Sequence, residues 1–395
     1  MQFLSKFIAQ CCTLWHNTSM QLSFDLTPDL IDALKNLDNE YAKIYGLLKS
    51  SVPEELEALH RYARVSMIGA STRIENAQLT DVEVNWLDTI LTEDGKPTAF
   101  EQHRVLIENK LSQDRERSIE EVAGCRAMLM LIYENPEDFF PLKENEVRAL
   151  HHELMSPYKG AIPYAGQYKL QSNSVIERNN ITGKTRIVFE TADAGPVTNV
   201  AMRDLVGWYN STLPHSPWPI AVACEFVFRF LGIHPFQDGN GRLGRGLFLL
   251  SLLHSKSETI SFVTRYIPID RHIEKHKEEY YFVLNRCSDG KFNQDPKEYK
   301  IQYFLKFMIK IIHESLAGIP LAQQKFRAEK GLSEAGATIL KCFREHPEIR
   351  LTTAKIIKQT GLARRTVIYT LNTLLDSLLI QKYGQGASTR YQLTF

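Results

Sequence analysis

The sequence lacks three features that would each point to a particular class of protein. Lys and Arg number 47 against 46 Asp and Glu, so the net charge of +1 gives the whole chain no attraction for nucleic acid or anionic membranes. Its most apolar stretch, residues 220–233, is too short to span a bilayer and is interrupted by Glu225 and Arg229. No C-x-x-C pair with metal or redox spacing occurs among the six cysteines, which are Cys11, Cys12, Cys125, Cys224, Cys287 and Cys342.

These absences lead us to expect a cytoplasmic protein without membrane contact. The first twenty residues hold a short apolar patch behind one lysine, but the patch is interrupted by polar residues and no convincing cleavage site follows it. We therefore treat residues 1–19 as a tail outside the fold.

The composition, 44% hydrophobic and 24% charged, is that of an ordinary globular chain, and 395 residues suggest two or three domains. Helical spacing of apolar residues dominates, beginning after Thr27 and Pro28, and predicts a mainly α-helical fold. We divide the chain into an N-terminal helical segment (20–115), a helical core (116–315), a linker (316–336) and a C-terminal domain (337–395).

Two local patterns add detail to the predicted core. Ser118 followed by Glu121 predicts a capping box at the start of a helix over residues 115–135. Residues 167–170 and 186–189 flank a turn-rich centre that contains Asn179, Asn180 and Gly183, and this predicts one β-hairpin within the helical core.

The C-terminal residues 338–395 are basic, with nine Lys and Arg against three Asp and Glu. Two helical patterns joined by a turn at Gly361 precede two strand-like segments, an order typical of a winged helix-turn-helix. Such domains bind DNA, or they serve in dimerisation and protein docking. If DNA is bound, the contacts expected are Arg364 and Arg365 at the start of the second helix and Lys382 and Arg390 beside the wing.

The densest chemical pattern is HPFQDGNGRLGR, residues 234–245, which lies between two apolar helical segments. Gly239, Asn240 and Gly241 can point successive backbone N–H groups at one spot, and the positive end of the following helix adds to them. Arg242 and Arg245 lie three residues apart and can reach separate phosphates. Together these residues predict an anion-binding cradle.

Two further residues in this segment suit catalysis on a phosphate ester. Asp238 supplies a hard oxygen ligand of the kind that Mg²⁺ takes beside phosphates. His234 is a neutral base with an ordinary pKa close to neutrality. Each of these features alone can have a purely structural role, whether the histidine before proline, the G-x-G or the arginine pair. Packing does not account for all of them within twelve residues.

The segment resembles, position for position, the Fic family motif H-P-F-x-D-G-N-G-R-x-x-R. This resemblance implies a helical core with the motif on a loop between two helices, and in most members transfer of AMP from ATP to a protein hydroxyl. It makes His234 the general base toward a Ser, Thr or Tyr hydroxyl and Asp238 the ligand of Mg²⁺. It also implies that the Asn240 side chain joins the phosphate cradle, and that Arg242 and Arg245 bind the β- and γ-phosphates.

The resemblance extends to both sides of the motif. Residues 166–191, with G-Q-Y-K in place of G-x-Y-R, resemble the family's flap, on which an extended stretch of a target protein docks. Glu279, Tyr280, Tyr281 and Leu284 resemble the helix beside the adenine, although Ser288 stands where some relatives carry an asparagine. The expected ATP-binding residues are Gly239, Asn240, Gly241, Arg242, Leu243, Gly244, Arg245 and Tyr281.

Residues 71–76, STRIEN, resemble the family's inhibitory pattern [S/T]-x-x-x-E-[G/N], with Ser71, Glu75 and Asn76 at the fixed positions. A glutamate placed against Arg245 would neutralise the cation meant for the γ-phosphate. We expect a self-inhibited enzyme, and homodimers by resemblance alone.

Three other functions fit the same residues. One is another phosphoryl transfer, against which the intact Gly241 and Arg242 argue. The second is removal of AMP from a modified target, with Glu75 positioning water. The third is a DNA-binding regulator in which the nucleotide site acts only as a sensor.

Overall fold

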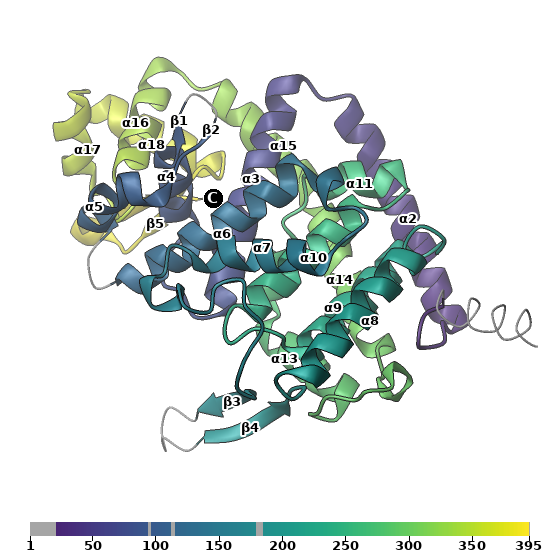
Figure 1. Cartoon of the computed structure of the whole chain (residues 1–395). Helices are drawn as coiled ribbons and strands as arrows, with labels where there is room; N and C mark the ends of the chain where they lie inside the picture. The colour runs from purple at the N-terminus through teal and green to yellow at the C-terminus, as the bar shows by residue number, and fades with distance from the viewer. Residues whose placement is uncertain (1–20, 94–95, 112–114, 179–184, 395) are drawn as a thin grey trace, which may run out of the picture.

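The structure is a computed structural model, and it describes residues 21–93, 96–111, 115–178 and 185–394 (Figure 1). The predicted mainly helical fold is confirmed. The N-terminal tail, Asn179, Asn180 and Gly183 lie outside the described residues. In the described ranges no helix is both long and apolar enough to cross a membrane.

The described helices fall into four groups along the chain. The first group comprises α2 (Pro28–Lys49), α3 (Pro53–Ile74), α4 (Asp81–Ile90) and α5 (Phe100–Leu111). The second comprises α6 (Glu116–Glu134), α7 (Glu144–Met155), α8 (Pro196–Thr212), α9 (Pro219–Ile233) and α10 (Asn240–Leu253). Then come α11 (Glu258–Thr264), α12 (Ile269–Lys275), α13 (Lys277–Ser288), α14 (Gln302–Ala317) and α15 (Ile319–Lys330). The last are α16 (Glu334–Glu345), α17 (Thr353–Thr360) and α18 (Arg364–Asp376).

Three antiparallel strand pairs interrupt the described helices. They are β1 (Thr92–Glu93) with β2 (Lys96–Pro97), β3 (Ser174–Arg178) with β4 (Thr185–Glu190), and β5 (Ile380–Tyr383) with β6 (Arg390–Leu393). The β3–β4 hairpin projects from the helical body at the bottom of Figure 1.

Helices α9 and α10 form the centre of the main core. Helix α9 is buried on almost all sides, as its apolar sequence requires, and it packs against α8, α10 and α14. It ends at His234, whose φ of 52° is left-handed, and α10 begins after Gly239, whose φ of 78° is also left-handed. The polar loop 234–239 is therefore a sharp reversal held between two buried helices.

Helix α3 brings the N-terminal segment to this reversal. It packs against α6, α10 and α12, and half of its length is fully buried. The helix extends to Ile74 and ends with Glu75 as its C-terminal cap. Its last turn carries the STRIEN segment onto the motif.

The predicted capping box at Ser118 is wrong. Helix α6 begins at Glu116, so Ser118 already lies in its first turn. The side-chain oxygen of Ser118 accepts a hydrogen bond from the backbone N–H of Gln78 at 3.1 Å, and Glu121 pairs instead with Arg117. Contacts of the folded chain thus take the place of the local cap.

The predicted strand at residues 167–170 is also displaced. The first strand of the hairpin begins at Ser174, whereas Tyr168 makes an isolated bridge to Phe236 of the motif loop. The backbone at Tyr168 is paired with the motif loop, and the hairpin begins only at Ser174.

The segment treated as a linker contains the helix α15. Gly318 keeps a right-handed backbone, with φ of −76°, and so it does not separate α14 from α15 sharply. Gln323 donates a hydrogen bond to Ser51 at 2.9 Å, and Arg327 pairs with Glu55 at 2.9 Å. The segment therefore lies against the N-terminal helices.

The C-terminal residues have a hydrophobic cluster of their own, centred on Ile339, Phe343, Leu351, Val367 and Leu371. Thr352 caps α17 by accepting the N–H of Lys355 at 3.2 Å, and Gly361 ends that helix with φ of 69°. Helices α17 and α18 and strands β5 and β6 follow one another in the predicted order, and α16 precedes them. This unit lies beside α4, at the upper left of Figure 1.

Candidate active site

A pocket of about 350 Å³ opens where the motif loop, the end of α3 and helix α13 meet. A volume of this order is typical of sites for small molecules and nucleotides. Its polar lining includes His234, Asp238, Asn240, Arg242, Arg245 and Glu75. On the opposite side, α13 supplies Tyr280, Tyr281, Leu284 and Asn285.

His234 presents its ring to this pocket from the C-terminal cap of α9. Its Nδ1 lies 3.3 Å from the carbonyl oxygen of Leu231. Because a carbonyl oxygen can only accept, this contact places the proton on Nδ1 and leaves Nε2 with a free lone pair. Burial lowers the pKa of His234 to about 4, so the ring is neutral near pH 7.

The low pKa values of buried histidines predict acid sensitivity. Burial lowers the pKa to about 4 in His60, His151 and His234, against an ordinary value of 6.5. Between these values the unfolded chain binds more protons, so stability rises with pH from about 4 to 6.5 and is lost as the pH falls through that window. At pH 5 each histidine would lower the free energy of unfolding by up to about 2 kcal/mol relative to pH 7.

Urea unfolding at pH 7 and pH 5 measures this loss. In a His60→Phe variant the difference in unfolding free energy between pH 7 and pH 5 should be smaller by the contribution of one histidine. Phe is chosen because it can keep the ring contacts with Tyr133 and Tyr266. An unfolding free energy equal at both pH values would contradict the prediction.

Gly239, Asn240 and Gly241, where the sequence predicts the cradle, line the pocket at the start of α10, and the N–H of Gly239 donates to the Asp238 carboxylate at 2.6 Å. The side chain of Asn240, however, is fully buried and closes the loop: its Oδ1 accepts the N–H of Phe236 at 3.0 Å, and its Nδ2 donates to the Phe236 carbonyl at 2.8 Å. Leu243 and Gly244 are buried against neighbouring helices and do not line the pocket. With the Asn240 side chain engaged in the loop, the donors that line the pocket at this end of α10 are those of Gly241, Arg242 and Arg245.

Arg245 is held by the inhibitory segment. Its guanidinium donates to the side-chain oxygen of Ser71 at 2.9 Å, to the Ser71 carbonyl at 2.8 Å and to the Glu75 carboxylate at 3.0 Å, and Asp270 lies 3.6 Å away. Burial alone would lower the pKa of Arg245, but the Glu75 and Asp270 carboxylates raise it above its ordinary value. A β-carbon at Gly241 would collide with the Glu75 carboxylate, which therefore lies directly against the cradle.

The end of α3 is fixed by contacts that do not involve the Glu75 carboxylate. Arg73 forms a two-pronged ion pair with Glu274, with distances of 2.6 and 2.9 Å. Asn76 has a left-handed backbone, with φ of 73°, and accepts a hydrogen bond from Lys277 at 2.9 Å. Tyr281 donates to the Ile74 carbonyl at 3.4 Å.

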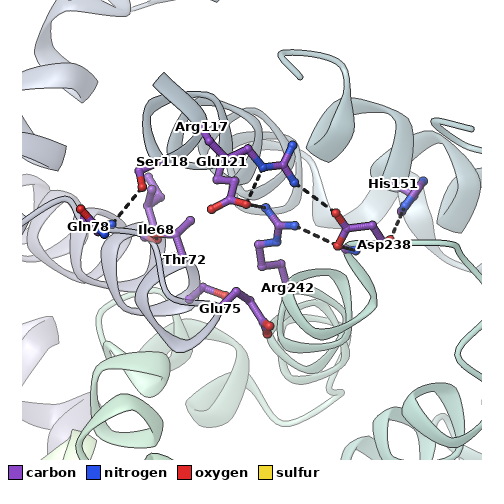
Figure 2. A network of polar contacts seen from close by, with 12 residues as sticks. Ile68, Thr72, Glu75, Gln78, Arg117, Ser118, Glu121, His151, Asp238 and Arg242 are labelled. Carbon is purple, nitrogen blue, oxygen red and sulfur yellow. Dashed lines mark hydrogen bonds and ion pairs between the residues drawn. The ribbon is translucent and has the colours of Figure 1, made fainter. Parts of the chain in front are cut away.

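Asp238 and Arg242 belong to a network of charges that Figure 2 shows. Arg242 lies 3.5 Å from Asp238 and 3.9 Å from Glu121. Arg117 donates to Asp238 at 3.1 Å and to Glu121 at 2.9 Å. The Nε of Arg242 is buried without a hydrogen-bond partner in the described chain. A buried donor left unpaired at a pocket fits a site that receives an anionic ligand.

In the described residues no group of three or more His, Cys, Asp or Glu side chains could hold a metal ion. The donor set of the pocket nevertheless fits Mg²⁺ bound with phosphate, since that ion takes one or two carboxylates and completes its shell with phosphate oxygens and water. Asp238 is the carboxylate that the motif loop contributes to the pocket.

His151 on α7 is a site residue that sequence reasoning missed. Its Nε2 donates to the Asp238 carbonyl at 2.9 Å, its Nδ1 accepts the N–H of Gly166 at 2.9 Å, and its ring stacks on Phe236 with centroids 3.8 Å apart. It therefore fastens the motif loop to the base of the hairpin. Its only signal in the sequence is a pair of adjacent histidines on a helix.

We expect His151→Phe to lower the free energy of unfolding by about 1–3 kcal/mol, because the ring stack persists while two backbone groups lose their partner. Urea unfolding measures the change. His152→Phe is the matched control, since the neighbouring His152 has a side chain that is 58% exposed. Equal effects of the two substitutions would contradict a fastening role for His151.

Lys169 is a second residue whose importance the sequence did not reveal. It is buried, and its Nζ donates to Asn173, Thr191 and the Ile233 carbonyl at 2.8–3.1 Å. Burial lowers the pKa of Lys169 to about 8. The lysine of G-Q-Y-K thus joins both ends of the hairpin to the residue before His234.

Helix α13 lines the pocket with Tyr281, as expected, but not with the residue at position 288. Tyr281 lines the pocket as expected, with 38% of the residue exposed. Ser288 is buried, and its hydroxyl contacts the carbonyls of Leu284 and Asn285, so it does not reach the pocket. Asn285, one turn earlier, is the amide that α13 contributes to the lining.

These features define a mainly helical protein whose site is built on a polar loop between two buried helices. Residues 141–252 match the Fic/DOC family. The chain therefore carries a Fic/DOC family domain, and this family includes protein adenylyltransferases and other nucleotidyl and phosphoryl transferases.

Solved structures show the same fold. A Fic family protein from Desulfovibrio desulfuricans is 24% identical, with a TM-score of 0.53, over 95% of this chain and 98% of that chain. A Fic domain containing signaling protein from Bacteroides thetaiotaomicron is 23% identical, with a TM-score of 0.53, over 74% of this chain and 97% of that chain. A fragment of Fic-1 from C. elegans is 15% identical, with a TM-score of 0.50, over 73% and 70%. At these identities the likeness concerns the fold.

Proposed function

We propose that this protein is an adenylyltransferase that transfers AMP from ATP to a Ser, Thr or Tyr hydroxyl of a target protein or of itself. The observation that carries the proposal is the convergence of His234, the N-terminus of α10 and two arginines, Arg242 and Arg245, on one pocket. A neutral base and an anion cradle in one cavity are what attack by a hydroxyl on a bound polyphosphate requires.

In the proposed reaction, Nε2 of His234 takes the proton of the target hydroxyl. The hydroxyl oxygen forms a bond to the α-phosphorus, the bond from the α-phosphorus to the bridging oxygen breaks, and pyrophosphate leaves. Backbone N–H groups at the start of α10 would bind the phosphates, while Arg242 and Arg245 would bind the departing charges. Asp238 would hold Mg²⁺, which when bound supplies further neutralisation of phosphate charge.

The hairpin β3–β4 is the proposed docking place of the target. Its strands pair antiparallel from Ser174 opposite Glu190 to Arg178 opposite Thr185, and the hairpin projects away from the helices (Figure 1). An extended target segment added to such a hairpin gains backbone hydrogen bonds that depend little on sequence.

The contact of Glu75 with Arg245 supports self-inhibition as part of the proposal. The carboxylate lies against Gly241 at the N-terminus of α10, where a terminal phosphate would otherwise bind. ATP could still enter the pocket, but its chain of phosphates would be displaced from the position that attack needs.

Incubation with ATP labelled at the α- or the γ-phosphate, followed by mass measurement, tests the reaction class. An addition of about 329 Da that retains the α-label corresponds to one AMP and supports the proposal. An addition of about 80 Da that retains the γ-label corresponds to one phosphoryl group and supports the phosphotransferase alternative. Loss of AMP from a modified target would support the reverse reaction.

The C-terminal unit supports a second candidate function, contact with DNA. Arg364, Arg365, Lys382 and Arg390 are all exposed, and Tyr369 on the same helix as the first two is 74% exposed. Exposed basic and aromatic side chains at the start of such a helix suit phosphate and base contacts. This function, like homodimer formation, stays a proposal beside the enzymatic one.

A further inference from the structure

Arg117 lies outside the family motif and makes three contacts at the edge of the pocket. It lies in the first turn of α6, where its Nε donates to Glu121 at 2.9 Å and an Nη donates to Asp238 at 3.1 Å. Its guanidinium also stacks on the ring of Tyr158 at 3.5 Å (Figure 2 shows the charged partners). The side chain is therefore held in one orientation although it is 39% exposed.

Both carboxylate oxygens of Asp238 already have partners in the folded chain. One carboxylate oxygen accepts the N–H of Gly239 at 2.6 Å and lies 3.5 Å from Arg242, and the other accepts from Arg117. A hard divalent cation would have to share or take over an oxygen that already binds a guanidinium. Two positive groups at one carboxylate repel each other, so cation binding and the Arg117 contact oppose each other.

We propose that Arg117 competes with the divalent cation for Asp238 and so sets the affinity of this site for a metal–nucleotide complex. Arg117 acts as a positioning residue, and Glu121 keeps it beside Asp238. This inference rests on the proposed function, because it concerns the cation that would accompany ATP.

Arg117 and Asp238 are both partly exposed, so a competing cation can break their ion pair. The side chains of Arg117 and Asp238 are 39% and 43% exposed, and ion pairs in such surroundings contribute little net stability. The cation can therefore displace Arg117, but at reduced affinity. Glu121 is only 13% exposed and pairs with Arg117 independently of Asp238, so Arg117 remains close when it is displaced.

The test measures binding of Mn²⁺ to the full chain with the α,β-methylene analogue of ATP, by the electron paramagnetic resonance signal of free Mn²⁺. Arg117→Gln should bind the Mn²⁺ complex about five- to tenfold more tightly than the wild type. Arg117→Lys, which keeps the charge, should return the affinity toward the wild-type value. Lys159→Gln is the matched control, since it removes one exposed positive charge from the 3₁₀ turn Lys159–Ala161, next to Tyr158.

An Arg117→Gln affinity equal to or weaker than wild type would overturn this inference alone. So would an equal gain in Lys159→Gln, which would reveal a general effect of net charge, or an Arg117→Lys variant that binds as tightly as Arg117→Gln. Absence of Mn²⁺ binding by the wild type and all variants would overturn the proposed function, and this inference with it.

Discussion

His234→Ala is expected to slow transfer of the α-label by about 10²–10⁴-fold, the range that a positioned general base contributes. ATP binding should persist, because the donors of the cradle lie on the backbone of α10 and on Arg242 and Arg245. The rate is best measured in a Glu75→Gly background, and binding by isothermal titration calorimetry with the α,β-methylene analogue of ATP.

His152→Ala serves as a control for this experiment, since it removes an exposed histidine from the same part of the fold. A His234→Ala rate equal to that of the control would remove His234 from catalysis. Loss of nucleotide binding in His234→Ala would instead indicate that the imidazole ring has a structural role in the pocket. A response to DNA that survives in His234→Ala, without any transfer in the wild type, would favour the sensor function.

Glu75→Gly is expected to raise automodification by at least about tenfold. The carboxylate forms a charge-assisted hydrogen bond with a buried arginine, and such bonds contribute about 1.5–3 kcal/mol. That energy holds Arg245 away from the phosphate it would bind. Incorporation of label from α-labelled ATP into the full chain measures the change.

Two variants narrow the interpretation of Glu75→Gly. Glu75→Gln keeps the shape and one hydrogen bond without the charge, so its rate should lie between those of the wild type and Glu75→Gly. Glu57→Gly removes an exposed carboxylate from the same helix and should leave the rate unchanged. A Glu75→Gly rate equal to that of the wild type would exclude the inhibitory role.

The parts of the fold that were predictable depend on local sequence. Apolar spacing along α9 and α10 predicted two buried helices, and the polar residues between them predicted the loop, although Asn240 and Gly241 form the start of α10. The STRIEN pattern led to Glu75, and the structure brings it to Arg245, 170 residues away in the chain.

The residues that were missed act through distant partners. His151 contacts Asp238 across 87 residues, and Arg117 contacts it across 121 residues. Helical spacing places His151 on the buried side of α7 with Val147 and Leu154, but the local sequence does not identify its partners, and that of α6 does not identify those of Arg117. The Ser118 and Glu121 pattern failed because Ser118 accepts from Gln78, 40 residues away, and Glu121 pairs with Arg117 within the helix.

The end of α3 remains attached through Arg73, Asn76 and Ile74 even if Glu75 turns away from Arg245. In the proposed self-inhibited enzyme, release of Arg245 would therefore need only a rotamer change of the Glu75 side chain, without separation of helices. Rotamer changes of side chains are faster than movements of whole helices, which take microseconds or longer. On this geometry the delay before turnover would come from whatever ligand or partner draws the carboxylate aside.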